Sequence, residues 1–144
     1  MKPTLSIGNT FTDHRGILRY VNEINPGYFC RFYLITHPHT NVVRAWQGHK
    51  IEEKAFYVIS GSFTIAVVQP LNFDYLSDEE MPQIYNLNED EGQLLRVPGG
   101  SFTGIKATAA NATLLVLSSL NVNDSKEDDF RQPSNRWVNW DSIN

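Results

Sequence analysis

Apolar and β-branched residues recur along this chain in short runs, separated by polar turns and by turns that contain glycine or proline. The runs span 17–21, 29–36, 42–46, 55–60, 63–68, 93–97, 102–107 and 113–120. Their length and their aromatic and β-branched content predict β-strands. Glycine and proline predict a tight hairpin turn at 60–62, a turn at 25–27 and a corner at 98–100. Regularly spaced short strands predict an all-β sandwich or jelly-roll barrel.

Some segments carry further expectations. Segment 113–120 is almost continuously apolar, which predicts a strand buried on both faces, either in a double-layered barrel or under a subunit partner. Segment 70–91 is acidic and predicts a long solvated loop, and 126–129 predicts a helical turn. Trp137 and Trp140 lie close to the C-terminus, so the tail is expected to dock on its own barrel or on a neighbour.

Composition narrows the class of protein. The chain has 144 residues, of which 41% are hydrophobic, which predicts a single packed domain over 1–144. Cys30 is its one cysteine, which excludes an internal disulfide and a cysteine-built metal site. The net charge is −4 with scattered basic residues, which argues against nucleic-acid binding. No apolar run is long enough to span a membrane, and no signal-peptide pattern follows Met1, so we expect a cytoplasmic protein.

Two stretches carry recognisable spacing: RAWQGHKIEEKAFYVISG at 44–61 and GQLLRVPGGSFT at 92–103. Their glycine and proline positions resemble the two motifs of the cupin superfamily. This resemblance implies a cupin-type double-stranded β-helix. It also aligns four residues with the metal-ligand positions of metal-binding cupins, namely Gln47, His49, Lys54 and Thr103.

Those four positions argue against a metal. Only His49 is a ligand type, because Gln47 and Thr103 are poor ligands and Lys54 places a positive charge where the motif has a carboxylate. One imidazole beside an ammonium group does not hold a divalent cation. We therefore expect no metal and no other cofactor in the barrel.

Two further histidines, His37 and His39, lie on either side of Pro38. The proline places this His-x-His pair in a loop without a carboxylate partner. We do not predict metal binding there.

A narrower resemblance covers most of the chain. DHRG at 13–16, RFYLI at 31–35, R-x-W-x-G-H-K at 44–50 and DDFR at 128–131 are similar to the sugar-nucleotide branch of the cupins. That branch includes dTDP-4-keto-6-deoxyglucose 3,5-epimerases and dTDP-sugar 3,4-ketoisomerases. The resemblance implies metal-free catalysis and a dimer in which an N-terminal strand of the partner completes each active site.

Proton transfer beside a ketone needs a base, a group that holds the enolate oxygen and an acid that returns the proton. His49 titrates near neutral pH and is the predicted base. It is expected to share an inward face with Gln47, and Lys54 is expected to lower the imidazole pKa and hold the enolate oxygen. Tyr33 or Tyr57 is predicted to return the proton, the alternative being that both are plain core aromatics.

Arg44 and Arg15 are the candidates for the diphosphate, because a guanidinium fork matches phosphate oxygens. Gln47 and Thr103 are candidates for binding sugar hydroxyl groups, or else neutral replacements in an inactive site. The enzymes of this branch have a histidine where this chain has Gln47, and glutamine cannot accept a carbon-bound proton. Either His49 is the base, or the protein binds its ligand without turnover.

The predicted function is therefore a metal-independent epimerase or ketoisomerase acting on a dTDP-4-keto-6-deoxyhexose. The alternative is a non-catalytic cupin that binds a nucleotide sugar or another carbohydrate. A metal-dependent dioxygenase or isomerase is disfavoured by the missing ligands. The doubly apolar segment 113–120 and the tryptophan-containing tail also predict a homodimer.

Overall fold

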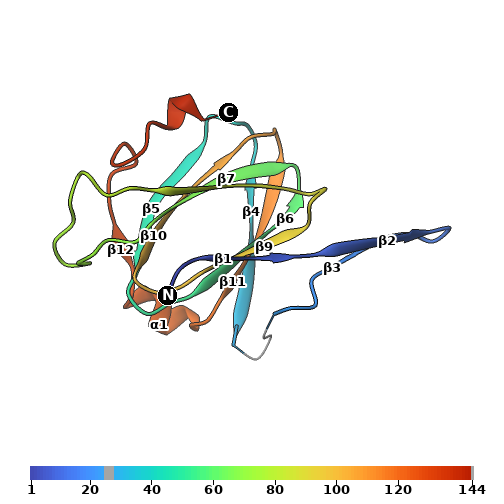
Figure 1. Ribbon diagram of the computed structural model, residues 1–144, viewed down its shortest axis with the longest axis horizontal. Coiled ribbons are helices and arrows are strands. Elements are labelled where there is room, and N and C mark those ends of the chain that lie inside the picture. The colour runs from blue at the N-terminus through green and yellow to red at the C-terminus, as the bar shows by residue number, and fades with distance from the viewer. Residues whose placement is uncertain (25–27, 144) are drawn as a thin grey trace.

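The computed structural model describes residues 1–24 and 28–143, and nearly all of its regular structure is β-strand (Figure 1). The predicted turn at 25–27 lies outside the described residues. The strands are β1 Thr4–Ile7, β2 Asn9–Asp13, β3 Gly16–Tyr20, β4 Arg31–His37, β5 Val43–His49, β6 Lys54–Ser60, β7 Ser62–Val68, β8 Gln83–Asn88, β9 Gln93–Val97, β10 Ser101–Ala107, β11 Ala112–Ser118 and β12 Phe130–Arg131. Two short helices, α1 Val122–Lys126 and the 3-10 helix η1 Trp140–Ser142, lie near the C-terminus.

Two five-stranded antiparallel sheets form the barrel. Their strand orders are β1-β9-β6-β11-β4 and β12-β5-β10-β7-β8. The inward side chains of both sheets meet in one core, which includes Phe56 and Val116 from the first sheet and Phe63 and Ile65 from the second. The predicted all-β fold is confirmed.

The turn at 60–62 is not a hairpin, contrary to the sequence prediction. It leads from β6 in the first sheet to β7 in the second, so the two strands do not pair. Gly61 has φ 79, and a Cβ there would approach the Cβ of Ala112 at 2.7 Å. The glycine therefore supplies a left-handed backbone and the close approach that a corner between the two sheets requires.

The predicted loop 70–91 contains a strand. β8 pairs with β7 from Gln83 to Asn88. Leu87 is buried in the core and Tyr85 packs against it, two residues apart as strand alternation requires. The acidic and polar neighbours of these two side chains hid that alternation in the sequence.

β11 is buried on one face only within the single chain, so the double-layered barrel is corrected, whereas cover by a subunit partner stays a prediction. Leu114 and Val116 point into the core, whereas Thr113, Leu115 and Leu117 are half-buried on the outer face of the sheet. No described segment of the chain covers this outer face completely, and it remains an apolar surface.

The N-terminal hairpin β2-β3 forms its own two-stranded sheet and extends away from the barrel as an arm (Figure 1). The predicted strand 17–21 is part of this arm rather than of the barrel. The predicted helical turn at 126–129 begins earlier, as α1, because the side chain of Asn121 accepts a hydrogen bond from the backbone N–H of Asp124 and caps the helix.

The C-terminal tail docks on its own barrel. Trp140 lies over Gly104 and packs with Trp46, whose ring centroid is 5.6 Å away. Lys106 donates hydrogen bonds to the carbonyls of Trp140 and Ile143, at 2.7 and 2.8 Å. The tail and the outer face of the second sheet therefore form a second apolar cluster, which confirms the first of the two predicted docking alternatives.

Among the described residues, no helix has the length and apolar character needed to cross a membrane.

We expect Trp140→Ala to lower the free energy of unfolding by about 3–5 kcal/mol, because it removes a large side chain that is only 7% exposed. Met81→Ala is the control, since Met81 is 85% exposed and its truncation should change stability by no more than about 0.5 kcal/mol. Urea titration of both variants measures the difference. Equal stabilities would show that the tail does not contribute to the folded barrel.

Candidate functional site

A cavity of about 580 Å³ opens between the two sheets. β4, β5, β6, β10 and β12 each contribute to its wall, because alternate residues of a strand face the same side. Its inward polar side chains are Tyr33, Arg44, Gln47, Lys54, Thr103 and Arg131. None of the described residues that line it is a histidine or a carboxylic acid.

Lys54 is the buried cation of this wall. Its residue is 5% exposed, and its Nζ donates to Gln47 Oε1 at 2.9 Å. The same Nζ lies 3.5 Å from Glu52 Oε2 and 5.8 Å from the centroid of the Tyr33 ring. The ammonium group is therefore fixed between an amide, a carboxylate and an aromatic face, and it remains at the cavity surface.

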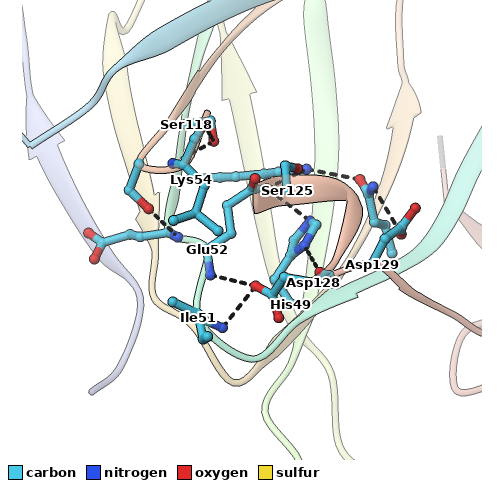
Figure 2. A network of polar contacts seen from close by, with 12 residues as sticks. His49, Ile51, Glu52, Lys54, Ser118, Ser125, Asp128 and Asp129 are labelled. Atoms are coloured by element: carbon cyan, nitrogen blue, oxygen red, sulfur yellow. Dashed lines mark hydrogen bonds and ion pairs between the residues drawn. The ribbon is translucent and has the colours of Figure 1, made fainter. Parts of the chain in front are cut away.

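Glu52 lies behind Lys54 at the centre of a buried polar network (Figure 2). Its carboxylate contacts Arg31 at 3.5 Å and His49 Nε2 at 3.1 Å as well as Lys54. Burial alone would raise the pKa of Glu52, but a hydrogen bond from Ser125 and the charges of His49 and Lys54 outweigh it and hold the pKa below its ordinary value. Glu52 is therefore ionised and compensates the positive charges around it.

Asp128 fixes the turn between β5 and β6. Its carboxylate accepts hydrogen bonds from the backbone N–H groups of Lys50, Ile51 and Glu52, at 2.9, 2.9 and 2.7 Å. Its backbone carbonyl lies 2.5 Å from His49 Nδ1. Figure 2 shows the Asp128 side chain pointing from the C-terminal segment toward the backbone of this turn. One residue of the tail thus places both His49 and Glu52.

His49 belongs to the network but does not line the cavity. It is nearly fully buried, with Nδ1 at the Asp128 carbonyl and Nε2 facing the carboxylate of Glu52. Burial lowers the pKa of His49, and the charge of Lys54 lowers it further, against the opposing effects of Glu52 and Asp128. The sequence analysis predicted a lowered pKa for His49 from the charge of Lys54, but burial of the ring is the larger cause of the lowering.

The cavity brings together Tyr33, Arg44, Gln47, Lys54 and Thr103 as the sequence predicted. The remaining three candidates lie elsewhere.

His49 is not among the residues that line the cavity, and its Nε2 faces Glu52 at 3.1 Å. Tyr57 lies on the outer face of its sheet, because it alternates with the inward residues Phe56 and Val58. Arg15 lies in the turn of the N-terminal arm, where it forms an ion pair with Asp13 at 2.6 Å.

Sequence reasoning missed four residues of the site: His37, Glu52, Asp128 and Arg131. Asp128 and Arg131 belong to the DDFR stretch at 128–131, which is part of the resemblance to the sugar-nucleotide branch of the cupins. That resemblance could have indicated both residues. Arg131 lines the cavity because β12 pairs with β5 opposite Gln47. No local pattern indicated Glu52, since its partners come from other parts of the chain.

No three histidine, cysteine or acidic side chains come together as a metal site anywhere in residues 1–24 and 28–143. The cavity wall itself offers cations, hydroxyl groups and an amide. These groups suit an anionic or hydroxylated ligand rather than a cation.

No known family model matches this sequence, and no curated protein matches it either. Solved structures do match its fold. A dTDP sugar isomerase from Desulfovibrio desulfuricans is 17% identical with a TM-score of 0.77, and the match covers 99% of this chain and 92% of that one. The WlaRB TDP-quinovose 3,4-ketoisomerase from Campylobacter jejuni is 23% identical with a TM-score of 0.72, covering 90% and 92% of the two chains.

A dTDP-4-dehydrorhamnose 3,5-epimerase from Bacillus anthracis, solved with TDP and pyrophosphate bound, is 18% identical with a TM-score of 0.75, covering 92% of this chain and 79% of the epimerase. The protein therefore has the fold of the dTDP-sugar isomerases and epimerases. The resemblance inferred from the two sequence motifs is confirmed at the level of the fold.

The lowered pKa of His49 makes stability depend on pH. The unfolded chain binds a proton at the ordinary imidazole pKa of about 6.5, whereas the folded chain binds it only at lower pH. The free energy of unfolding should therefore fall as the pH drops below about 7, by at most about 1.4 kcal/mol per pH unit for this group. Chemical denaturation between pH 7.5 and 5 measures the slope.

His49→Gln should reduce this slope, and His14→Gln, at an exposed position in the arm, should leave it unchanged. A slope in His49→Gln equal to that of the wild type would contradict the assignment. His37 retains its own contribution in both variants, because burial also lowers its pKa.

Proposed function

We propose that the barrel cavity binds a nucleoside diphosphate sugar, of the dTDP-4-keto-6-deoxyhexose class. The observation that carries this proposal is the charge of the wall: Arg44, Lys54 and Arg131 come from three different strands, and no described lining residue is acidic. A diphosphate matches guanidinium groups in charge and geometry. Gln47 and Thr103 are placed to bind sugar hydroxyl groups. The fold shared with dTDP-sugar enzymes supports the same ligand class.

We further infer isomerase chemistry at the Lys54 end of the cavity, as an epimerase or a 3,4-ketoisomerase. Removal of a proton beside the sugar ketone creates an enolate, and a fixed buried ammonium stabilises that oxygen. Tyr33 lies beside Lys54 and carries the hydroxyl group that returns the proton. Neither Lys54 nor Tyr33 removes the first proton, because Lys54 is the ammonium group and Tyr33 is the donor. We assign this step to His49, the base that the sequence predicts, with the Glu52 carboxylate, 3.1 Å from Nε2, passing the proton to the imidazole ring.

We also propose that the protein is a homodimer, because the outer face of the first sheet is apolar and exposed. On the outer face of the first sheet, Leu34 lies opposite Leu115 and Phe32 lies opposite Leu117, and residues in opposite register share a face. Phe32 is 67% and Leu34 58% exposed. A contiguous apolar sheet face of this kind is typical of an interface. In such a dimer the arm carries Arg15 toward the partner, in keeping with the strand exchange that the family resemblance implies.

Wild-type protein should bind TDP-4-keto-6-deoxyglucose in a calorimetric titration and should incorporate solvent deuterium beside its ketone in a proton NMR experiment. Lys54→Met should slow this exchange by about 10²–10³-fold, the usual effect of removing one group that stabilises an oxyanion. Lys50→Met is the matched control, because Lys50 is exposed and pairs with Asp74 outside the cavity.

The variant His49→Gln tests whether His49 is the base. Exchange that survives this variant would overturn His49 as the base and assign that role to another group. Exchange that is lost, with binding kept within about tenfold, assigns the base to His49, since general bases contribute about 10²–10⁴-fold. Binding without exchange over hours would overturn the isomerase and leave the non-catalytic nucleotide-sugar binder. Absence of binding would overturn the proposed function itself.

The dimer predicts twice the chain mass of 16.4 kDa in multi-angle light scattering at micromolar concentration. Leu34→Lys should give the monomer, because it places a charge in the centre of the apolar face. Met81→Lys, at an exposed position on the β7–β8 loop, should remain dimeric. A 16 kDa wild-type species would contradict the dimer.

A further inference from the structure

His37 has an unusual environment for a residue that the sequence placed in a surface loop. It is the last residue of β4 and is 0% exposed. Its ring packs edge-on against Phe63, with centroids 5.5 Å apart. His39, two residues later, is exposed. The His-x-His pair is therefore split between the barrel interior and the surface.

Within residues 1–24 and 28–143 the His37 ring forms one hydrogen bond, and it goes to the cavity wall. Arg44 Nε donates to His37 Nε2 at 3.2 Å. Because a guanidinium group has only donors, Nε2 carries the lone pair, and the neutral ring carries its proton on Nδ1. Burial, together with the charge of Arg44 and of His39, lowers the pKa of His37 and keeps it neutral.

The His37 ring is not explained by packing. Nδ1 is buried and has no hydrogen-bond partner among the described residues. A buried polar atom without a partner is unfavourable, so a site that served only the core would favour an apolar side chain. The ring's remaining polar contact is the one to Arg44.

Arg44 differs from the other two cations of the cavity. Lys54 lies 3.5 Å from the carboxylate of Glu52, and Arg131 lies 2.8 Å from that of Asp129. Arg44 has no carboxylate at ion-pair distance within the described part of the chain. The neighbour of Arg44 is the neutral ring of His37, so the full charge of the guanidinium group is available to a ligand. With Nε engaged by His37, the two terminal nitrogens are left to form a fork with phosphate oxygens.

We propose that His37 is a positioning residue that holds the guanidinium group of Arg44 through Nε, so that its terminal nitrogens receive the diphosphate of the bound nucleotide. This inference rests on the proposed nucleotide-sugar function. A neutral acceptor is suited to this role, because a carboxylate in the same place would orient Arg44 equally well but would cancel the charge that attracts the phosphate.

The test is calorimetric binding of TDP and of thymidine, which lacks the phosphates. His37→Gln keeps an acceptor near the Nε2 position and should bind TDP within about threefold of wild type. His37→Asn places its amide too close to the backbone to reach Arg44, and His37→Phe fills the volume without an acceptor. Both should weaken TDP binding by about 10–100-fold, the range for a lost charged hydrogen-bond pair. Thymidine binding should be unchanged in all three variants.

Arg44→Gln should weaken TDP binding at least as much as His37→Phe, and the double variant should be no weaker than Arg44→Gln alone, because His37 acts through Arg44. Circular dichroism establishes that each variant is folded; if His37→Phe is not, the Gln and Asn pair decides the question. Equal TDP affinity in the Gln and Asn variants, or additive losses in the double variant, would overturn the role of His37 while the proposed function stands. Wild-type protein that fails to bind TDP would overturn the proposed function instead.

Discussion

The base of the cavity depends on the ion pairs formed by the buried carboxylate of Glu52. A carboxylate without exposed surface is stable only when charges and hydrogen bonds replace its water. Glu52 obtains them from Arg31 on β4, His49 on β5 and Lys54 on β6. Removing Arg31 or Lys54 leaves charge uncompensated in the interior. The three strands are therefore held in one arrangement by the same group that fixes Lys54 at the cavity surface.

The network also makes the site depend on the C-terminal tail. The turn that presents Glu52 has three backbone N–H groups bound by Asp128, which lies more than 70 positions further along the chain. The same C-terminal segment supplies Arg131 to the cavity wall. The residues after Arg131 are anchored to the outer face of the second sheet by Trp140. The tail and the site therefore stabilise each other, since the backbone N–H groups of the turn are satisfied by the carboxylate that the tail supplies.

How far the sequence predicts this structure depends on the range of the interactions involved. Strand alternation is local, so the inward positions of Gln47, Lys54 and Thr103 follow from the two motifs. The hairpin expected at Gly61 was wrong, because the residues of a tight turn do not reveal whether the next strand stays in the same sheet. The position of His49 behind the wall is set by Asp128 and by the side chain of Glu52. No pattern within a single strand encodes such a contact.

The charge of the wall connects the fold to its ligand. In metal-binding cupins a glutamate occupies the position of Lys54, so that a carboxylate faces the cavity and balances a cation. Here the carboxylate, Glu52, is withdrawn behind the wall and an ammonium group faces inward. The sign of the charge presented to the ligand is thereby reversed, while the charge buried in the protein remains compensated. Arg44, whose Nε donates to His37, adds a further positive charge that no carboxylate in the described part of the chain balances.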